Sequence, residues 1–291
     1  MSLFRTFLFV PGSNKRWFNK LANYESDNII LDLEDSVPLV NKDEARENVL
    51  NSISVLAAQQ QKVYVRINKE AFVYSQKDLH AVIQQDLEGL VLPKVNGPED
   101  IEEVSSQIAE IEKVKNLPVG SVKLIPTLES ARSLYLAYEI GLKDRVIGIA
   151  GLTAKDGDIQ RSINYQWTPQ GFETLYYRSK IVLAARAANV IPIGGLWQEV
   201  HNLEGLKKSA SFNRQLGYDG EMVLHPSNVP IVNDIYSPTV EEIDYYRGML
   251  IEFEKAEESG LNAVIYDGNH IDAAHIKTAR RVLDYASKIY S

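Results

Sequence analysis

The stretch N-I-I-L-D-L-E-D-S-V occupies residues 28–37 and joins an apolar run to three carboxylates within four positions. Its Ile- and Leu-rich first half is typical of a strand buried on both faces, as in parallel sheets. Asp32, Glu34 and Asp35 follow at once. A carboxylate removed from water is costly unless it is paired, hydrogen-bonded or metal-bound. We therefore expect this strand to end at an open mouth of a sheet, near water, cations or a ligand.

Seven other apolar runs of strand length are rich in Val and Ile, and segments with helical periodicity separate them. The alternation has about the 30-residue spacing of βαβ units. Eight such strands predict a closed (β/α)₈ barrel. The predicted strands cover residues 6–12, 28–34, 62–68, 89–95, 123–129, 146–152, 191–195 and 220–226. The predicted helices cover 14–24, 42–58, 78–85, 98–115, 131–141, 170–188 and 203–216.

An open, doubly wound sheet is the alternative architecture. It would require a Gly-rich nucleotide-binding turn after the first strand. The chain has P-G-S-N-K-R there, at residues 11–16, and this is not G-x-G-x-x-G. The barrel is therefore the preferred prediction.

The pattern changes near residue 238, so we predict a barrel domain over residues 1–237 and a C-terminal helical extension over 238–291. Thr239 followed by acidic residues predicts the start of a long helix, because side-chain caps and the helix dipole favour both. A strand with an Asp-Gly turn and a last helix follow. A minimal barrel has no place for this extension, which could dock on a neighbouring subunit.

Composition limits the partners of the chain. The net charge of −8 argues against nucleic acid and anionic membranes as partners, because both repel an acidic body. There are no cysteines, which excludes a disulfide framework, a thiolate metal site and a cysteine nucleophile and fits a reducing cytoplasm. The apolar run before Pro11 is too short to span a membrane.

In (β/α)₈ barrels the active site is built at the C-terminal ends of the strands. Five carboxylates and only two cations, Arg66 and Lys94, occupy these ends, so the acidic excess requires a bound cation. Oxygen ligands without cysteine indicate Mg²⁺. Glu129 and Asp156 follow adjacent strands and could share one metal ion. The alternative is that the carboxylates form salt bridges with Arg66 and Lys94.

Several motifs, in order along the chain, resemble the citrate lyase beta subunit family, which includes malyl-CoA and citramalyl-CoA lyases within the HpcH/HpaI aldolase superfamily. They include L-F-V-P-G (8–12), I-L-D-L-E-D-S-V (30–37), V-R-I-N (65–68), L-E-S-A-R (128–132), R-S-K-I-V-L-A-A-R-A-A (178–188) and D-G-N-H-I-D (267–272). The resemblance implies a homotrimeric barrel, or a multiple of a trimer. It also implies Mg²⁺-dependent carbon–carbon cleavage of a 3-hydroxyacyl thioester, carried by coenzyme A or by an acyl carrier.

The same resemblance implies roles for individual residues. Glu129 and Asp156 correspond to the metal ligands, and Arg66 corresponds to the cation at the substrate carbonyl or enolate oxygen. Asp272 resembles the acid/base that the family sends into the neighbouring subunit's site. Retro-Claisen cleavage collects negative charge on a thioester enolate, which such cations stabilise.

The remaining acidic and basic candidates have supporting roles. Glu34 and Asp35 are expected to anchor metal-bound waters or Arg66, while Asp32 makes structural hydrogen bonds. Arg16 is the candidate for a phosphate of coenzyme A, at the helix after the first strand. Lys94 is either a substrate-binding cation or an ion-pair partner of Glu34.

The chain departs from the family's pattern at two places. Lys155 replaces an acid before Asp156, and a different gap would make Asp158 the metal ligand instead. Gly194 and Gly195 stand where relatives carry I-D-T, and we expect them to enlarge or empty that part of the pocket. His225 is expected to be a hydrogen-bonded histidine closing the eighth strand. A carrier-dependent, non-catalytic subunit of a multi-subunit complex is the alternative function.

Overall fold

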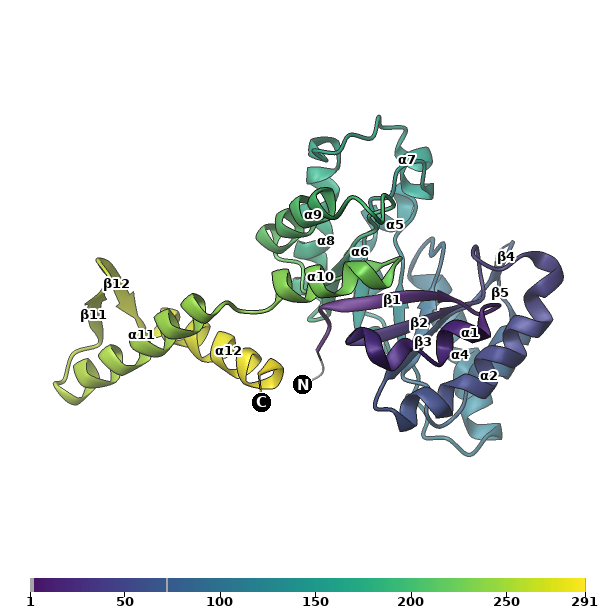
Figure 1. Ribbon diagram of the computed structural model, residues 1–291, viewed down its shortest axis with the longest axis horizontal. Helices are drawn as coiled ribbons and strands as arrows, with labels where there is room; N and C mark the ends of the chain where they lie inside the picture. The colour runs from purple at the N-terminus through teal and green to yellow at the C-terminus, as the bar shows by residue number, and fades with distance from the viewer. Residues whose placement is uncertain (1–2, 72, 291) are drawn as a thin grey trace. The chain divides into compact units, whose positions relative to one another are not determined.

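Eight parallel strands form a single sheet in the computed structural model, which describes residues 3–71 and 73–290 (Figure 1). Their order, β7-β6-β3-β2-β1-β10-β9-β8, follows the chain around a ring. Backbone bonds between the two end strands, such as Leu128 N–H to the Ala150 carbonyl at 2.9 Å, close it. The predicted (β/α)₈ barrel is confirmed. The strands are β1 Thr6–Pro11, β2 Asn28–Asp32, β3 Lys62–Arg66, β6 Gly89–Leu92, β7 Lys123–Pro126, β8 Gly148–Ala150, β9 Ile191–Gly194 and β10 Gly220–Val223.

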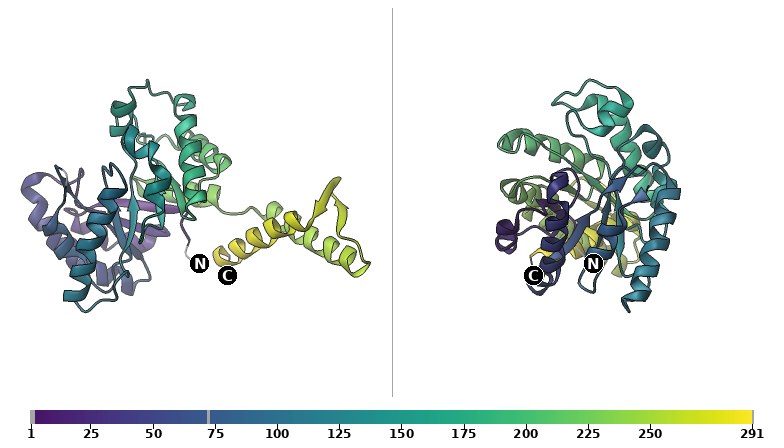
Figure 2. Two further views of the ribbon diagram at one scale, coloured as in Figure 1. Left: turned by 180° about the vertical axis from the view of Figure 1, so that it is seen from behind. Right: turned by 90° about the vertical axis from the view of Figure 1, so that its right-hand side faces the viewer.

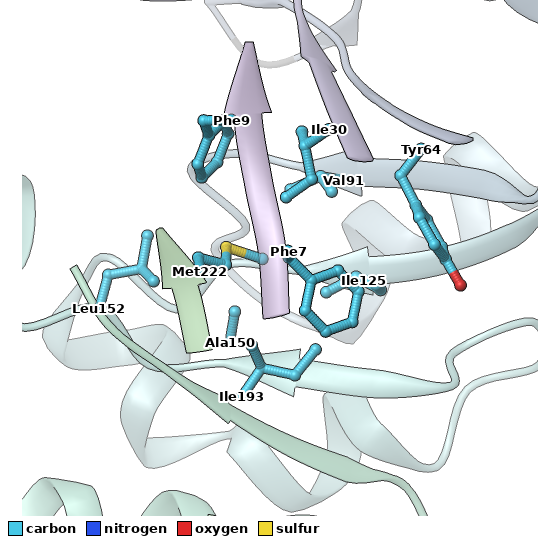
Figure 3. Close-up of a cluster of buried hydrophobic side chains, with 10 residues drawn as sticks. All are labelled: Phe7, Phe9, Ile30, Tyr64, Val91, Ile125, Ala150, Leu152, Ile193 and Met222. Carbon is cyan, nitrogen blue, oxygen red and sulfur yellow. The ribbon is translucent and has the colours of Figure 1, made fainter. Parts of the chain in front are cut away.

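The barrel interior is filled by apolar side chains, to which every one of the eight strands contributes (Figure 3). The rings of Phe7 and Tyr64 pack edge to face, with centroids 5.7 Å apart. A packed interior leaves no channel, so polar chemistry is confined to the ends of the strands. The buried cluster is Phe7, Phe9, Ile30, Tyr64, Val91, Ile125, Ala150, Leu152, Ile193 and Met222.

Helices surround the strands (Figure 2, right). The predicted helices at 42–58 and 203–216 are confirmed at the same bounds, and those at 78–85, 98–115 and 170–188 within a few residues. The helical bounds are α2 Lys42–Ala58, α3 Gln76–Val82, α4 Pro98–Val114, α7 Asp158–Ile163, α8 Leu175–Ala187, α9 Leu203–Leu216 and α10 Val229–Tyr236, with 3₁₀ turns η2 Leu39–Asn41, η3 Phe172–Thr174 and η4 Pro226–Asn228.

Two predicted helices are wrong in their continuity. Residues 14–24 form α1 (Lys15–Phe18) and the 3₁₀ turn η1 (Leu21–Tyr24), and residues 131–141 form α5 (Ala131–Tyr135) and α6 (Ala137–Gly141). In each pair a linking residue, Lys20 or Leu136, takes ψ near 0° rather than the helical value, which interrupts the hydrogen-bond ladder. The short hairpin of β4 (Lys69–Glu70) and β5 (Val73–Tyr74) was not predicted.

The chain divides into two compact units between residues 233 and 234, whereas the sequence predicted a boundary between 237 and 238. The C-terminal unit contains α11 (Val240–Glu258), the antiparallel strands β11 (Ala263–Tyr266) and β12 (Asn269–Asp272), and α12 (Ala273–Ile289). Thr239 and Glu242 cap α11 reciprocally, as the sequence indicated. A small core holds the unit together: Met249, Phe253, Ile271, Ile276 and Ala279.

Across the described residues, no helix combines the length and apolar character that a bilayer crossing requires.

Candidate active site

Arg66 stands at the end of β3 and is bound on one side by Asp32, at the end of β2. The register places these residues opposite each other. Nε and Nη2 of Arg66 lie 2.7 Å from the two carboxylate oxygens of Asp32. The guanidinium also lies over the ring of Phe9, 4.8 Å from its centroid. Three contacts from the two neighbouring strands β1 and β2 therefore hold the cation in one orientation.

Burial opposes ionisation of Asp32, but the hydrogen bonds and charge of Arg66 outweigh it and lower the pKa of Asp32. Its two oxygens also accept the backbone N–H groups of Glu34 (2.9 Å) and Ser36 (3.1 Å). The predicted structural role of Asp32 is confirmed. Its pairing with Arg66 is one of the salt bridges that the sequence left open.

Glu34 lies between the two cations. Its Oε1 accepts a 2.5 Å hydrogen bond from Lys94 Nζ, and its Oε2 lies 3.1 Å from Nη1 of Arg66. Asp35 is 3.5 Å from the same Lys94 amine. The ion-pair alternative for Lys94 is thus observed, and its contact with substrate stays a prediction.

One carboxylate oxygen of Glu34 nevertheless lacks a hydrogen-bond donor among the described residues. Oε2 is buried and makes no hydrogen bond within residues 3–71 and 73–290, because its approach to Arg66 does not have hydrogen-bond geometry. Burial raises the pKa of Glu34, and the charges of Arg66 and Lys94 only partly offset it. A buried carboxylate oxygen without a donor is the kind of group that a cation or its bound water satisfies.

Glu129 follows β7, which is separated from β3 by one strand, β6, in the barrel. Burial raises the pKa of Glu129 to about 7, and the negative charges of Glu34 and Asp158 add to this effect. Thr127 opposes it by donating its hydroxyl to Oε1 at 2.7 Å. Half of these carboxyl groups would be protonated at neutral pH, so the site gains from a positive charge beside Glu129.

Asp156 and Asp158, the two alternatives for the second ligand, differ in their surroundings. Asp156 is exposed, has a left-handed backbone (φ 57°), and is held through its backbone N–H, 2.7 Å from Gln160 Oε1. Asp158 opens α7, pairs with Arg161, and its charge acts on both Glu129 and Lys94. The electrostatics therefore favour Asp158, and the choice between the two stays open.

The donor set fits a magnesium ion. No group of three or more His, Asp or Glu side chains is close enough to hold a metal in the described part of the chain. Mg²⁺ commonly takes only one or two protein carboxylates and fills its octahedron with water and substrate. The near-neutral pKa of Glu129 and the unsatisfied Oε2 of Glu34 are what such a site predicts before the ion binds.

Two residues of the site were not predicted. Lys42, the first residue of α2, donates from Nζ to the carbonyls of Leu33 (2.5 Å) and Glu34 (2.7 Å) and to Asn68 Oδ1 (2.7 Å). It thereby fixes the loop that carries the acidic residues. In the sequence it resembles any lysine at an exposed helix start. The second residue is Thr127. In the sequence, only its position two residues before Glu129 distinguishes it.

Arg16 lies on the four-residue helix α1 and is exposed. The neighbouring Trp17 lines a cavity of about 360 Å³ together with Phe9, Tyr24 and His225. His225 lies with Nδ1 2.7 Å from the hydroxyl of Ser227, as predicted for a hydrogen-bonded histidine. The cavity therefore lies between β1 and the helix that carries Arg16, and one of its lining residues, Phe9, also contacts Arg66.

Gly194 and Gly195 do not empty the pocket, so that prediction is wrong. A Cβ on Gly194 would lie 2.9 Å from the Asn213 side chain, and one on Gly195 would collide with the Met222 backbone. Gly195 also has φ of 109°, which side chains rarely adopt. These glycines permit close packing of β9 against its neighbours.

Asp272 belongs to the C-terminal unit and ends β12. Its Oδ1 accepts from the Ala274 N–H (2.9 Å) and lies 2.7 Å from His275 Nδ1, so it caps α12. The carboxylate is about half exposed, at 47% of its side-chain surface. An accessible acid on this unit is compatible with the predicted role in a neighbouring subunit, which stays a prediction.

Comparison with known proteins identifies the family, since the model for HpcH/HpaI aldolase/citrate lyase matches residues 5–226. The chain belongs to this family. Its members include the citrate lyase subunit beta of Haemophilus influenzae, which is 32% identical over 287 residues, or 98% of each chain. The (3S)-malyl-CoA thioesterase of Cereibacter sphaeroides is 27% identical over 98% of this chain and 95% of its own. The predicted resemblance is confirmed, and with it the lyase class of enzyme.

Solved structures show the same fold in this family. Protein CitE from Mycobacterium tuberculosis, in complex with magnesium, acetoacetate and coenzyme A, has a TM-score of 0.77 at 23% identity over 98% of both chains. A citrate lyase beta subunit from the same organism, with oxaloacetate and magnesium, has a TM-score of 0.67 at 24% identity over 81% of this chain and 98% of its own.

Proposed function

We propose that this protein is a Mg²⁺-dependent lyase that cleaves a 3-hydroxyacyl thioester of the citryl-, malyl- or citramalyl-CoA type. One observation carries the proposal: an oriented cation, Arg66, and a carboxyl group of near-neutral pKa, Glu129, lie at the same barrel mouth. Solved relatives bind magnesium with oxaloacetate or with acetoacetate and coenzyme A. Those ligands suit a cation site that faces an acidic one.

Each side chain has a distinct task in the proposed reaction. Glu129, with Asp156 or Asp158, would hold the magnesium ion. When bound, Mg²⁺ supplies charge that orients the hydroxyl and carboxylate of the 2-oxo-acid half and lowers the hydroxyl pKa. Arg66 donates to the thioester oxygen as the bond breaks and the enolate forms, because its orientation is preset by Asp32 and Phe9.

Glu34 and Asp35 support this centre. Glu34 accepts from Lys94 and leaves Oε2 for a metal-bound water. Asp35 shares the Lys94 amine at 3.5 Å.

Protonation of the enolate carbon completes the reaction. We assign it to Asp272, or to water beside it, reaching the site from a neighbouring subunit in a homotrimer or a multiple of one. Its pKa is held low by its hydrogen bond to His275 and by the Ala274 N–H, so Asp272 is ionised at the start of the reaction. It therefore takes the proton of the substrate hydroxyl, directly or through a water molecule, and returns that proton to the enolate carbon. Among the described residues of the C-terminal unit, Asp272 is the one acid that forms a reciprocal helix cap with a histidine, His275.

The carrier portion of the thioester would occupy the cavity of about 360 Å³ at the end of β1, where Trp17 and Phe9 provide apolar walls. Arg16 lies beside Trp17 and is the candidate for a phosphate contact. A cytoplasmic location is consistent with such a metabolic substrate.

A second function is favoured by the names of the relatives. Citrate lyase subunit beta is one chain of a larger assembly by its name, and another relative is a thioesterase. The protein would then act on a carrier-bound acyl group inside a complex, or hydrolyse the thioester.

The test uses the full-length protein with Mg²⁺ and malyl-, citramalyl- or citryl-CoA, and measures released 2-oxo acid and free thiol separately. Cleavage produces 2-oxo acid and an acyl-CoA, whereas hydrolysis produces free thiol. Turnover should disappear in Glu129→Gln. If none of the thioesters reacts although Mg²⁺ raises the melting temperature, the carrier-dependent subunit is the better description.

A further inference from the structure

A second cavity, of about 200 Å³, lies where the loops after β8 and β9 meet helices α8 and α9. The side chain of Arg178, from α8, contributes to its wall. None of its lining residues is Arg66, Lys94 or one of the acidic residues assigned above. The side chains that line this cavity are therefore different from those assigned to the proposed active site.

Arg178 is a buried cation without a carboxylate partner. The residue is 5% exposed, and among residues 3–71 and 73–290 no Asp or Glu forms an ion pair with it, although the charge of Glu173 acts on it. Nη1 donates to Asn213 Oδ1 at 3.0 Å, but Nε is buried and has no hydrogen-bond partner in the same part of the chain. A guanidinium offers five donors, and a buried charge left unpaired is strongly destabilising.

The surroundings hold this guanidinium in place without a direct ion pair. The Phe212 ring lies 5.6 Å from its central carbon, and Gly171 approaches so closely that a Cβ there would lie 2.9 Å from Nη2. Asn213, its one side-chain partner, turns its own amide N–H group to Glu221 at 2.8 Å. Glu221 is thus separated from the cation by Asn213, and Glu173 acts on it through its charge without an ion pair.

We propose that this cavity binds a small organic monocarboxylate, whose carboxylate pairs with Arg178. A carboxylate matches the planar fork of a guanidinium. The rings of Trp167 and Trp197 form apolar walls, which suit a short carbon body and argue against inorganic phosphate. Glu199 also lines the cavity, so a second negative charge on the ligand would be repelled.

A ligand bound in this cavity is expected to affect the loop after β8, which carries Asp156. Thr153 and Lys155 line it, and they immediately precede Asp156. Lys155 Nζ lies 6.0 Å from the Trp167 ring centroid, at the cavity wall. A carboxylic product or an intracellular acid bound here would stabilise one conformation of that loop.

The experiment measures melting temperature and calorimetric binding of the full chain with butyrate or pyruvate in EDTA, so that the metal site cannot contribute. Saturable binding with a rise of about 5 °C at 100-fold excess over Kd is expected. Sodium sulfate at the same ionic strength should not reproduce it. No saturable response to either monocarboxylate, or an equal response to sulfate, would overturn the proposal.

Variants separate the site from a purely structural role. Arg178→Met should lose the carboxylate response and keep the response to Mg²⁺, whereas Arg186→Gln, on the same helix but exposed and paired with Asp219, should keep both. If Arg178→Met does not fold, Arg178→Lys retains the charge and lacks the fork, and its affinity should fall at least tenfold. A carboxylate response that survives in the Met variant, or full affinity in the Lys variant, contradicts the assignment. Because the readout is free of metal, it is independent of the proposed lyase activity.

Discussion

Asp32 and Arg66 lie opposite each other on adjacent parallel strands, and two hydrogen bonds of 2.7 Å join them. The pair is buried, with side-chain exposures of 2% and 13%. Because Asp32 occupies Nε and Nη2, the remaining Nη1 points toward Glu34, 3.1 Å away. The orientation of the cation at the barrel mouth is thus decided by a residue that contacts no substrate in the proposed reaction.

Replacement of Asp32 by Asn should therefore reduce turnover and stability together. Loss of one partner from a buried ion pair is expected to lower the free energy of unfolding by about 3 kcal/mol. The kcat should fall more than KM changes, because the misplaced Arg66 stabilises the transition state less well. The matched control is Asp27→Asn, which breaks the buried Arg5–Asp27 pair (2.7 Å) at the other end of β1. Equal kinetic losses in both variants would show that Asp32 acts only through stability.

Removal of the carboxylate of Glu129 should abolish stabilisation by magnesium. In Glu129→Gln the melting temperature should no longer rise with Mg²⁺, while without metal the variant should be as stable as the parent or more so, since the carboxyl group is unfavourably buried. Differential scanning calorimetry with and without Mg²⁺ measures both. Glu112→Gln is the control: it breaks a buried pair with Arg145 (2.7 Å), so it should destabilise the protein but retain the metal response.

The pKa of Glu129 also predicts a pH dependence. Its folded-state pKa of about 7 is above the ordinary value of 4.5, so the folded protein binds more protons than the unfolded chain between these values. Stability of the metal-free protein should then fall as pH rises from about 4.5 to 7, by up to about 3 kcal/mol from this group. Mg²⁺ binds the ionised form, so its affinity should rise about tenfold per pH unit below 7 and level off above it. Identical Mg²⁺ affinities at pH 6 and pH 8 would contradict this assignment.

Thr127 should adjust that pKa. Its hydroxyl donates to the ionised Glu129 at 2.7 Å, so Thr127→Val should raise the pKa of Glu129 further and shift the pH profile of Mg²⁺ affinity upward. Thr127→Ser keeps the donor and should behave like the parent. The shift is read from Mg²⁺ titrations between pH 5.5 and 9. A profile unmoved by the Val variant would mean that the hydroxyl serves only the Leu92 carbonyl, which lies 3.0 Å away.

The second metal ligand can be decided by a pair of variants. Asp158→Asn should weaken Mg²⁺ binding at least tenfold, because the charge of Asp158 acts on Glu129. Asp156→Asn tests the residue that the family resemblance indicated, and isothermal titration of both variants measures the difference. A loss confined to Asp156→Asn would restore the original assignment and would require the 151–158 loop to rearrange around the ion.

Much of the architecture could be predicted from local pattern. The eight apolar runs became the eight barrel strands, because residues buried on both faces leave a continuous hydrophobic signal. The helix at 203–216 also kept its bounds, since Asn202 caps its first turn and Gly217 takes a left-handed conformation after its last. The breaks near Lys20 and Leu136 left no such signal, because periodicity continues across a single residue that leaves the helix.

The sequence by itself determined that carboxylates and cations would gather at the ends of the strands, since each follows an apolar run and parallel strands share one edge. Only the tertiary structure decided the partners. Strand register joined Asp32 to Arg66, and the depth of burial distinguished Glu129, with its raised pKa, from Asp156 in water. Register and burial depend on contacts between residues far apart in the chain, and no local pattern contains them.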